Sequence, residues 1–465
     1  MIRHIALAVL LGATGVASAN GRPAGTSTIT FRQNAEQHIL AGMTFGLLSS
    51  KDNGATWQWM CEKAVLYGGM YDPDYVYHRG GAWFATTFDG ALVNRDGCVF
   101  QPMQFGKKFF SSVTQGPDGA ILMAAADVPG AGNPGDAKIY RSTDGGMTFN
   151  NGATAGMIND WYNSLEVAPT DASRVYLSGY RITDGIRSWQ IYKSLNGGTS
   201  FTPVTSTGFT TSENSNIDVV GIKVGTPDTV FVRVTITDGS LGDAIWRSDN
   251  AGQSWTKIFP TATFPVRDNL SLVARANGDL VIASSNSGMY VARGPTNATW
   301  EMVAGAPHVN CLVENTAGEL WACTQNFGSP GFPSDDAGIM KTTNLTSWTK
   351  VLRYQDIQGP IDCPVGTRQH NQCVYDCPDA TFDENPALCA REVPKGWCGL
   401  KNLYGITWPG LECPAVFDSP PENDVGVSKK PGCCSAGDYG GGSATLVLAL
   451  GVGTVILRSR RRRIR

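Results

Sequence analysis

The sequence predicts an all-β protein whose main domain is a seven-bladed β-propeller built from four-stranded blades. A short turn motif occurs seven times between Ser50 and Trp348. Each copy ends in an aromatic residue, and these recur every 43 to 54 residues, at Trp57, Phe100, Phe149, Phe201, Trp255, Trp300 and Trp348. The chain contains 55 glycines in 465 residues, which favours many turns. Repeats of this length are typical of propeller blades, each with four short strands.

The best copies of the motif read S-x-D-x-G-x-T followed by Trp or Phe, at residues 50–57 and 142–149. Copies at 194–201 and 248–255 carry asparagine in place of aspartate, and those at 94–100, 292–300 and 342–348 are degenerate. The pattern resembles the Asp-box, or BNR repeat, of sialidase-like propellers. In such a hairpin the short polar side chain accepts hydrogen bonds from the turn and glycine supplies the backbone conformation. We therefore expect structural, noncatalytic roles for Asp52, Asp96, Asp144, Asn196 and Asn250.

Residues 1–19 read as a secretory signal peptide, with Arg3 and His4, an apolar run, and a small-x-small cleavage site at 17–19. Residues 28–356 are the expected propeller, and residues 357–432 form a Cys, Pro and Gly-rich module that would need disulfides to hold a fold. Twelve cysteines fit an oxidising destination. We predict that Cys311 and Cys323 pair across adjacent strands and help to close the ring. The connectivity of the other cysteines stays open.

The C-terminal segment, 433–465, combines Cys433 and Cys434, a short apolar helix over 444–457 and an arginine cluster. This order resembles the MYXO-CTERM sorting signal. The resemblance implies initial anchoring in the inner membrane, cleavage by a sorting protease, modification at Cys433 or Cys434, and display on the cell surface or release. A plain C-terminal membrane anchor is the alternative.

Charge and composition narrow the classes of partner. Without the signal and the arginine tail the body holds 30 Lys and Arg against 40 Asp and Glu, so it carries about −10, which argues against nucleic acid. We expect no cofactor and no metal. The Cys373-x3-Cys377 spacing suggests zinc only weakly, and disulfides are favoured in an exported chain.

Ligand binding is expected on the propeller face opposite the motif turns, because loops on a rigid scaffold usually carry function. Aromatic and polar residues in these loops can hold a sugar or a peptide. The expected ligand-binding rim comprises Trp161, Tyr162, Tyr180, Arg181, Arg187, Trp189, Arg267 and His308. Each tryptophan taken alone also fits a packing role.

Two classes of function remain open. The main prediction is a noncatalytic surface propeller that binds an extracellular protein or polysaccharide, as sortilin-like receptors with related repeats do. The alternative is a glycoside hydrolase, sialidase-like or endo-glucanase-like, with Asp160 and Asp243 as weak catalytic candidates and Asp335 and Asp336 as further carboxylates. The segment 31–34 lacks the proline of the sialidase Arg-Ile-Pro motif, so the role of that motif's arginine does not transfer to Arg32.

Overall fold

The computed structural model describes residues 23–67, 72–126, 136–184, 186–208, 216–236, 242–265, 270–286, 288–294, 296–297, 299–328, 333–374, 396–411 and 413. The predicted signal peptide, Cys377, the apolar segment 444–457, Cys433 and Cys434 lie outside these residues. Within them, no helix is long and apolar enough to cross a membrane.

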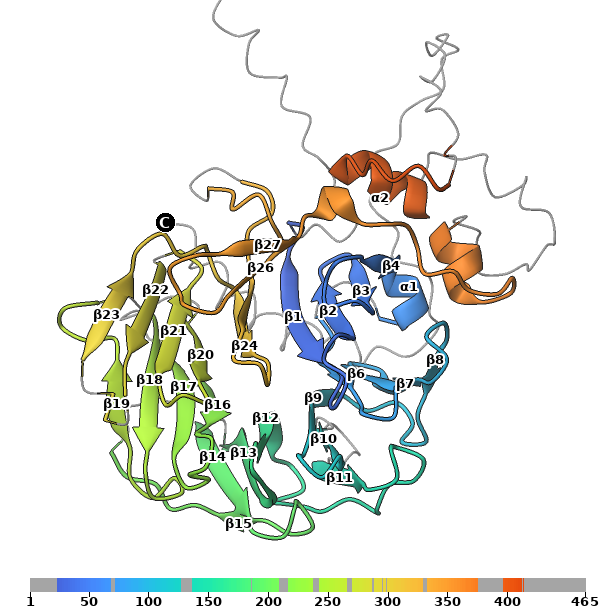
Figure 1. Ribbon diagram of the computed structural model, residues 1–465. Helices are drawn as coiled ribbons and strands as arrows, with labels where there is room; N and C mark the ends of the chain where they lie inside the picture. Colours follow the sequence, from blue (N-terminus) through green and yellow to red (C-terminus); the bar gives the residue numbers. More distant parts are fainter. Residues whose placement is uncertain are drawn as a thin grey trace, which may run out of the picture. The chain divides into compact units, whose positions relative to one another are not determined.

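Seven antiparallel sheets surround one axis, and in each sheet the strands follow one another in chain order from the axis outward (Figure 1). The prediction of a seven-bladed all-β propeller is confirmed. The first three blades contain β1 (Thr26–Phe31), β2 (Ile39–Met43), β3 (Gly46–Ser50) and β4 (Gln58–Met60); β5 (Tyr75–Tyr77), β6 (Trp83–Thr87), β7 (Gly90–Asn94) and β8 (Phe100–Pro102); and β9 (Phe110–Gln115), β10 (Ile121–Ala125) and β11 (Lys138–Ser142).

The remaining four blades each have four strands. They contain β12 (Trp161–Ala168), β13 (Asp171–Thr183), β14 (Ile186–Ser194) and β15 (Thr202–Pro203); β16 (Asn216–Ile222), β17 (Val230–Ile236), β18 (Gly242–Ser248) and β19 (Thr256–Phe259); β20 (Leu270–Ala274), β21 (Leu280–Ser284), β22 (Gly288–Ala292) and β23 (Trp300–Val303); and β24 (Cys311–Glu314), β25 (Leu320–Cys323), β26 (Ile339–Thr342) and β27 (Thr349–Leu352). Blade 3 departs from the four-stranded expectation, since a single bridge between Ile139 and Ala153 stands where its fourth strand would be.

The motif turns are held by their own side chains. Ser50 Oγ donates to Asp52 Oδ1 (2.9 Å) and accepts from the Gly54 amide (2.9 Å), while Thr56 Oγ1 donates to Asp52 Oδ2 (2.6 Å). In the asparagine copies the corresponding hydrogen bond runs in the opposite direction: Asn196 Nδ2 donates to Ser200 Oγ (2.8 Å), whereas Asp52 accepts from Thr56. These contacts explain why the turn accepts either residue type.

Asp144 and Asp96 form the same kind of contact. Hydrogen bonds from Thr148 and Ser142 hold the pKa of Asp144 far below its usual value, and Asp96 Oδ1 accepts from the amides of Cys98 (2.8 Å) and Val99 (2.9 Å). Both carboxylates are therefore occupied by their own turns.

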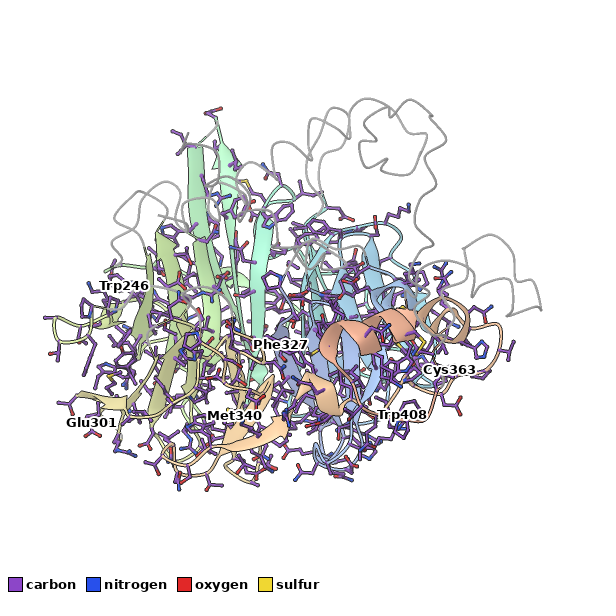
Figure 2. All side chains as sticks on the ribbon, turned by 90° about the horizontal axis from the view of Figure 1, so that it is seen from above. Trp246, Glu301, Phe327, Met340, Cys363 and Trp408 are labelled. Carbon is purple, nitrogen blue, oxygen red and sulfur yellow. A yellow bond between two sulfur atoms is a disulfide. The ribbon has the colours of Figure 1, made fainter. Side chains whose placement is uncertain are left out.

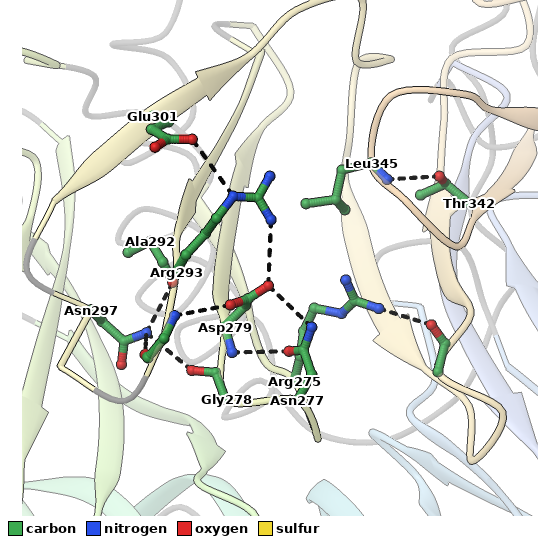
Figure 3. A network of polar contacts seen from close by, with 12 residues as sticks. Arg275, Asn277, Gly278, Asp279, Ala292, Arg293, Asn297, Glu301, Thr342 and Leu345 are labelled. Carbon is green, nitrogen blue, oxygen red and sulfur yellow. Dashed lines mark hydrogen bonds and ion pairs between the residues drawn. The ribbon is translucent and has the colours of Figure 1, made fainter.

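The degenerate turn of blade 6 is closed by different residues (Figure 3). Asn297, with φ 48°, donates through Nδ2 to the carbonyls of Ala292 (2.9 Å) and Gly294 (2.7 Å). Asp279 accepts from the Gly294 amide (3.0 Å) and lies 3.6 Å from Arg293 Nη1. An asparagine in the left-handed conformation thus closes this turn in place of the motif residues.

The glycine that follows the motif aspartate by two residues packs against the preceding blade. A Cβ on Gly146 would lie 2.5 Å from the Phe84 ring of blade 2, and one on Gly54 would lie 2.4 Å from Val351 of blade 7. Both glycines also have positive φ, 76° and 83°. The motif glycine therefore permits both the turn and the close approach of neighbouring blades.

We expect Gly146→Ala to lower the free energy of unfolding by about 2–3 kcal/mol, because it combines backbone strain with overpacking against Phe84. Gly305→Ala is the matched control: its φ is 71°, with open space around the added Cβ, and about 1 kcal/mol is expected. Urea unfolding of both variants checks this. Equal losses would show that the blade contact adds nothing.

Ring closure depends on residues that follow the last blade. The Gln358 amide donates to the Trp57 carbonyl (2.8 Å), Trp59 N to Gly359 O (2.9 Å) and Ile361 N to Trp59 O (2.8 Å), so this segment pairs in parallel with β4. Across the same seam, Phe31 meets Trp321 edge to face at 5.3 Å. This pairing has no counterpart in the sequence prediction.

Two disulfides fasten the same segment: Cys61–Cys373 and Cys98–Cys363 connect blades 1 and 2 to residues 312 and 265 positions later. Figure 2 shows Cys363 and Trp408 beside the blue strands of these blades. The predicted Cys311–Cys323 disulfide is confirmed, but it lies within blade 7 and does not cross the seam. The expectation that it closes the ring was wrong, because its two strands belong to the same sheet.

The described part of the Cys-rich module packs on blade 1. It comprises the π-helical turn η2 (Gln369–Val374) and α2 (Gly396–Tyr404), with α1 (Glu62–Val65) of blade 1 against η2; the short helix η1 (Tyr354–Asp356) directly precedes the module. Trp397 and Tyr404 belong to the same apolar cluster as Leu47 and Trp59. Cys373 pairs with Cys61, and Cys398 with Cys413. The module therefore shares the core of the propeller.

Candidate functional site

A cavity of about 190 Å³ opens between blades 2 and 3 on the face opposite the motif turns. The segment 72–74 leads into β5, residues 86–89 form the turn from β6 to β7, and residues 109–111 lead into β9. All three segments lie at the same end of blades 2 and 3, the end at which the inner strands β5 and β9 begin. The lining combines Asp72, Asp74 and Asp89 with the rings of Tyr67, Phe88, Phe109 and Phe110, and we call this cavity the acidic pocket.

Two carboxyl groups of the acidic pocket have contrasting surroundings. Asp74 Oδ2 accepts hydrogen bonds from the Val113 amide (3.2 Å) and from Ser112 Oγ (3.4 Å), both on blade 3. Burial nevertheless raises the pKa of Asp74 to about 6. Asp89 lies in a turn and is exposed to water. One group is thus poised to hold a proton near neutral pH while the other is solvated.

Four rings, which we call the aromatic row, run from the acidic pocket across blades 3 and 4. Phe88 stacks on Phe109 (centroids 4.5 Å apart, 29° between planes), Phe109 on Trp161 (5.0 Å, 23°) and Trp161 on Tyr180 (6.1 Å, 19°). The guanidinium of Arg187 lies over Tyr180, 3.8 Å from its centroid. Phe88 is 39% exposed and the other three rings are half-buried.

Strand register places the far end of the row. Trp161 opens β12 opposite Tyr180 of β13, and Tyr180 in turn faces Trp189 of β14. Arg187 Nη1 donates to Asn216 Oδ1 of blade 5 (2.6 Å), which fixes the guanidinium. The long hairpin of β13 and β14 extends past the neighbouring strands (Figure 2). The structure therefore brings Trp161, Tyr180 and Arg187 of the expected rim together.

Two other residues of the expected rim, both in blade 4, form hydrogen bonds with buried groups. Tyr162 is fully buried, and its hydroxyl accepts from the Ala155 amide (3.2 Å). Arg181 donates from Nε to Asp160 Oδ1 (2.6 Å) and from Nη2 to Asp160 Oδ2 (2.9 Å). Asp160 is only 2% exposed and also accepts from Tyr192. The structure gives Asp160 the geometry of a buried connector, with both oxygens bonded.

Asp243 is held in the same way. Its Oδ1 accepts from Thr235 Oγ1 (2.9 Å) and its Oδ2 from the Leu270 amide (3.0 Å), and it is 6% exposed. Neither weak catalytic candidate points an unbonded oxygen towards the rim.

The remaining expected residues are dispersed. His308 pairs through Nδ1 with Asp335 (3.0 Å), Asp336 pairs with Lys350 (2.8 Å), and both pairs lie on blade 7. Trp189 is partly buried against the core of blades 4 and 5. Arg267 lies outside the described residues. Arg32 donates Nε and Nη2 to the Arg79 carbonyl at the opposite face (3.1 and 3.0 Å).

Glu166 is a second carboxyl group whose pKa departs strongly from the usual value. It lies on β12, nearest the axis, and burial raises its pKa to about 8, with the charge of Asp74 adding to the effect. A raised folded-state pKa means that folding favours the protonated form. The stability that protonated Glu166 contributes is therefore complete below pH 4.5, and it is lost as the pH rises through 8.

We therefore expect Glu166→Gln to be neutral at pH 4.5 and to stabilise the protein by about 1–2 kcal/mol at pH 9, after allowance for solvent screening at a partly exposed group. Thermal melts at the two pH values measure the difference. If the stability difference between the variant and the wild type were the same at both pH values, the raised pKa of Glu166 would be contradicted.

Sequence reasoning missed Asp74 and Asp89. The available signals were the Asp72-Pro73-Asp74 run immediately before a strand and the Phe88-Asp89-Gly90 turn. Both sit in blade 2, whose strands are short and whose motif is degenerate. Their closeness follows from the pairing of β5 with β6, in which the Thr86 amide donates to the Asp74 carbonyl, and the sequence pattern alone does not give this register.

No family model matches the sequence. The chain is 25% identical over 281 residues to a xyloglucanase of Hypocrea jecorina (strain QM6a), covering 58% of this chain and 30% of that protein. An ancestral GH74 enzyme aligns with a TM-score of 0.47 at 14% identity, over 64% of this chain and 44% of that one. YCF48 from Cyanidioschyzon merolae aligns with a TM-score of 0.41 at 14% identity, over 64% of this chain and 92% of that one. A GH74 xyloglucanase from Xanthomonas campestris aligns with a TM-score of 0.28 at 14% identity, over 75% of this chain and 66% of that one. This chain thus spans less than a third of the curated xyloglucanase to which it is similar.

Proposed function

We propose that the protein is an exported propeller that hydrolyses an extracellular polysaccharide at the acidic pocket. The observation that carries this proposal is the presence of Asp74 and Asp89 in one cavity, in opposite environments, beside the rings of Phe88 and Phe109. Glycoside hydrolysis generally uses two carboxyl groups with different protonation states, and apolar ring surfaces suit sugars.

The roles follow from the surroundings of each group. Asp74, protonated up to about pH 6, donates its proton to the glycosidic oxygen as the bond from that oxygen to the anomeric carbon breaks. Asp89 takes a proton from the water that adds its oxygen to the anomeric carbon. Each turnover consumes one water, and proton exchange with solvent restores both carboxyl groups.

Similarity to a xyloglucanase over 281 residues supports the hydrolase alternative over noncatalytic binding, and makes xyloglucan the first substrate to test. The mature protein, incubated with xyloglucan and with unbranched β-glucans between pH 4 and 8, is expected to release oligosaccharides detectable by mass spectrometry. Binding without products throughout this range would overturn the proposal and return the protein to the class of ligand-binding propellers.

The chain's ends and its repeats fit an exported Asp-box propeller with a MYXO-CTERM-like tail, and we extend the proposal to that processing. Cleavage after residue 19 and at Cys433 or Cys434 is expected. Intact-mass measurement of protein recovered from the producing cells tests both sites. A mature chain that retains the arginine cluster would favour a plain membrane anchor.

A further inference from the structure

We propose that the substrate is a long polysaccharide chain that lies along the aromatic row, from the acidic pocket across blades 3 and 4, and is cleaved internally. This inference rests on the proposed function and specifies its substrate class. Phe88 and Phe109 line the pocket, so the row begins at the cleavage site. Tyr180 and Arg187 lie at its far end, one blade further round the ring.

The ring geometry leaves surface for sugars. Parallel rings in contact lie about 3.5 Å apart along their normals. Centroid separations of 5.0 Å at Phe109 to Trp161 and 6.1 Å at Trp161 to Tyr180 therefore require sideways displacement, so that neighbouring rings overlap only in part. The half-buried state of these rings agrees with such an overlapping arrangement. Phe88 is exposed and the other three residues are half-buried, so part of each remains accessible to the apolar side of a pyranose.

The row is also rigid. Phe88 comes from the turn between β6 and β7, Phe109 and Trp161 come from the starts of inner strands, and Tyr180 comes from the paired hairpin of β13 and β14. Arg187, at the end of the row, is fixed by Asn216. A prepositioned surface loses little conformational entropy when it binds a ligand. The Arg187 guanidinium offers donors to sugar hydroxyl groups at the end of the row.

Chain length separates this inference from the proposed function. For wild-type protein we expect kcat/KM to rise with the length of β-glucan oligosaccharides until the row is filled. Trp161→Ala is expected to lower kcat/KM about tenfold for long chains and less than twofold for the shortest substrate cleaved. Trp161→Phe should recover most of the loss. Met157→Ala removes an exposed apolar side chain from the connection before β12 and should change neither value.

Equal losses for short and long substrates would assign Trp161 a structural role and overturn the inference, as would unchanged turnover of long chains. Either result leaves hydrolysis at the acidic pocket intact. Affinity electrophoresis covers the case in which the wild type binds β-glucans without cleaving them. If the wild type then binds long chains more tightly than short ones, and Trp161→Ala abolishes that difference, the hydrolase proposal fails and the binding path along the row stands.

Discussion

Replacing Cys61 and Cys373 by alanine is expected to cost more stability than removing the disulfide within blade 7. Because Cys98–Cys363 stays in place, the Cys61–Cys373 bond closes a loop of about 47 residues, for which the chain-entropy model gives about 4 kcal/mol. Measured losses commonly fall below this model, so we expect about 3–4 kcal/mol. Guanidinium unfolding of the variant, compared with the wild type at the same protein concentration, gives the value.

Cys311→Ala with Cys323→Ala is the matched control. That disulfide spans 12 residues and joins strands already paired in one sheet, and the same model gives about 3 kcal/mol. Hydrogen exchange locates the effect: in the Cys61 and Cys373 variant, amides of β1 to β4 and β24 to β27 should exchange faster than those of blades 3 to 5. If the variant lost no more stability than the control, and its amides exchanged uniformly around the ring, the Cys61–Cys373 disulfide would not be what holds the seam between blades 7 and 1.

The sequence was sufficient for the fold because the information is local and repeated. Ser50, Asp52, Gly54, Thr56 and Trp57 each act within one turn, and the hydrogen bonds of that turn use the side-chain chemistry visible in the motif. Even the degenerate turn at Asn297 keeps the spacing of the aromatic residue. Period and turn chemistry together therefore predict blade number and strand order.

Ring closure was not predictable in this way. The pairing of Gln358 and Ile361 with β4, and of Cys61 with Cys373, joins residues about 300 positions apart, and no local pattern marks the partners. Connectivity among many cysteines is undetermined by sequence alone. Closure follows only once the seven sheets are placed around one axis.

The candidate site was predicted in part. The face that carries the candidate site follows from the topology of a four-stranded blade, and Trp161, Tyr180 and Arg187 were expected on that face. Alternation along β12 separates Trp161, on the rim, from Tyr162, whose side chain enters the core. The raised pKa of Asp74 is a tertiary property, because it results from burial of the carboxyl group beside blade 3, where Val113 and Ser112 also contact it.

Asp74→Asn is expected to reduce turnover of polysaccharide by a factor of about 10²–10⁴, because an amide fills the same space but cannot donate the proton that the leaving oxygen needs. Wild-type activity should fall as the pH rises above about 6, since Asp74 acts in its protonated form and loses the proton there. The residual activity of the variant should lack this limb. Rates of product release measured from pH 4 to 8 give both results.

Stability distinguishes loss of chemistry from loss of structure. A neutral side chain at position 74 avoids burying a charge, so Asp74→Asn should melt at or above the wild-type temperature at pH 8 and close to it at pH 4. Asp184→Asn removes an exposed carboxylate from the same face, at a left-handed position that asparagine tolerates, and should retain full activity. If Asp74→Asn keeps wild-type turnover and its pH profile, Asp74 is not the proton donor, and the acidic pocket loses its assigned chemistry.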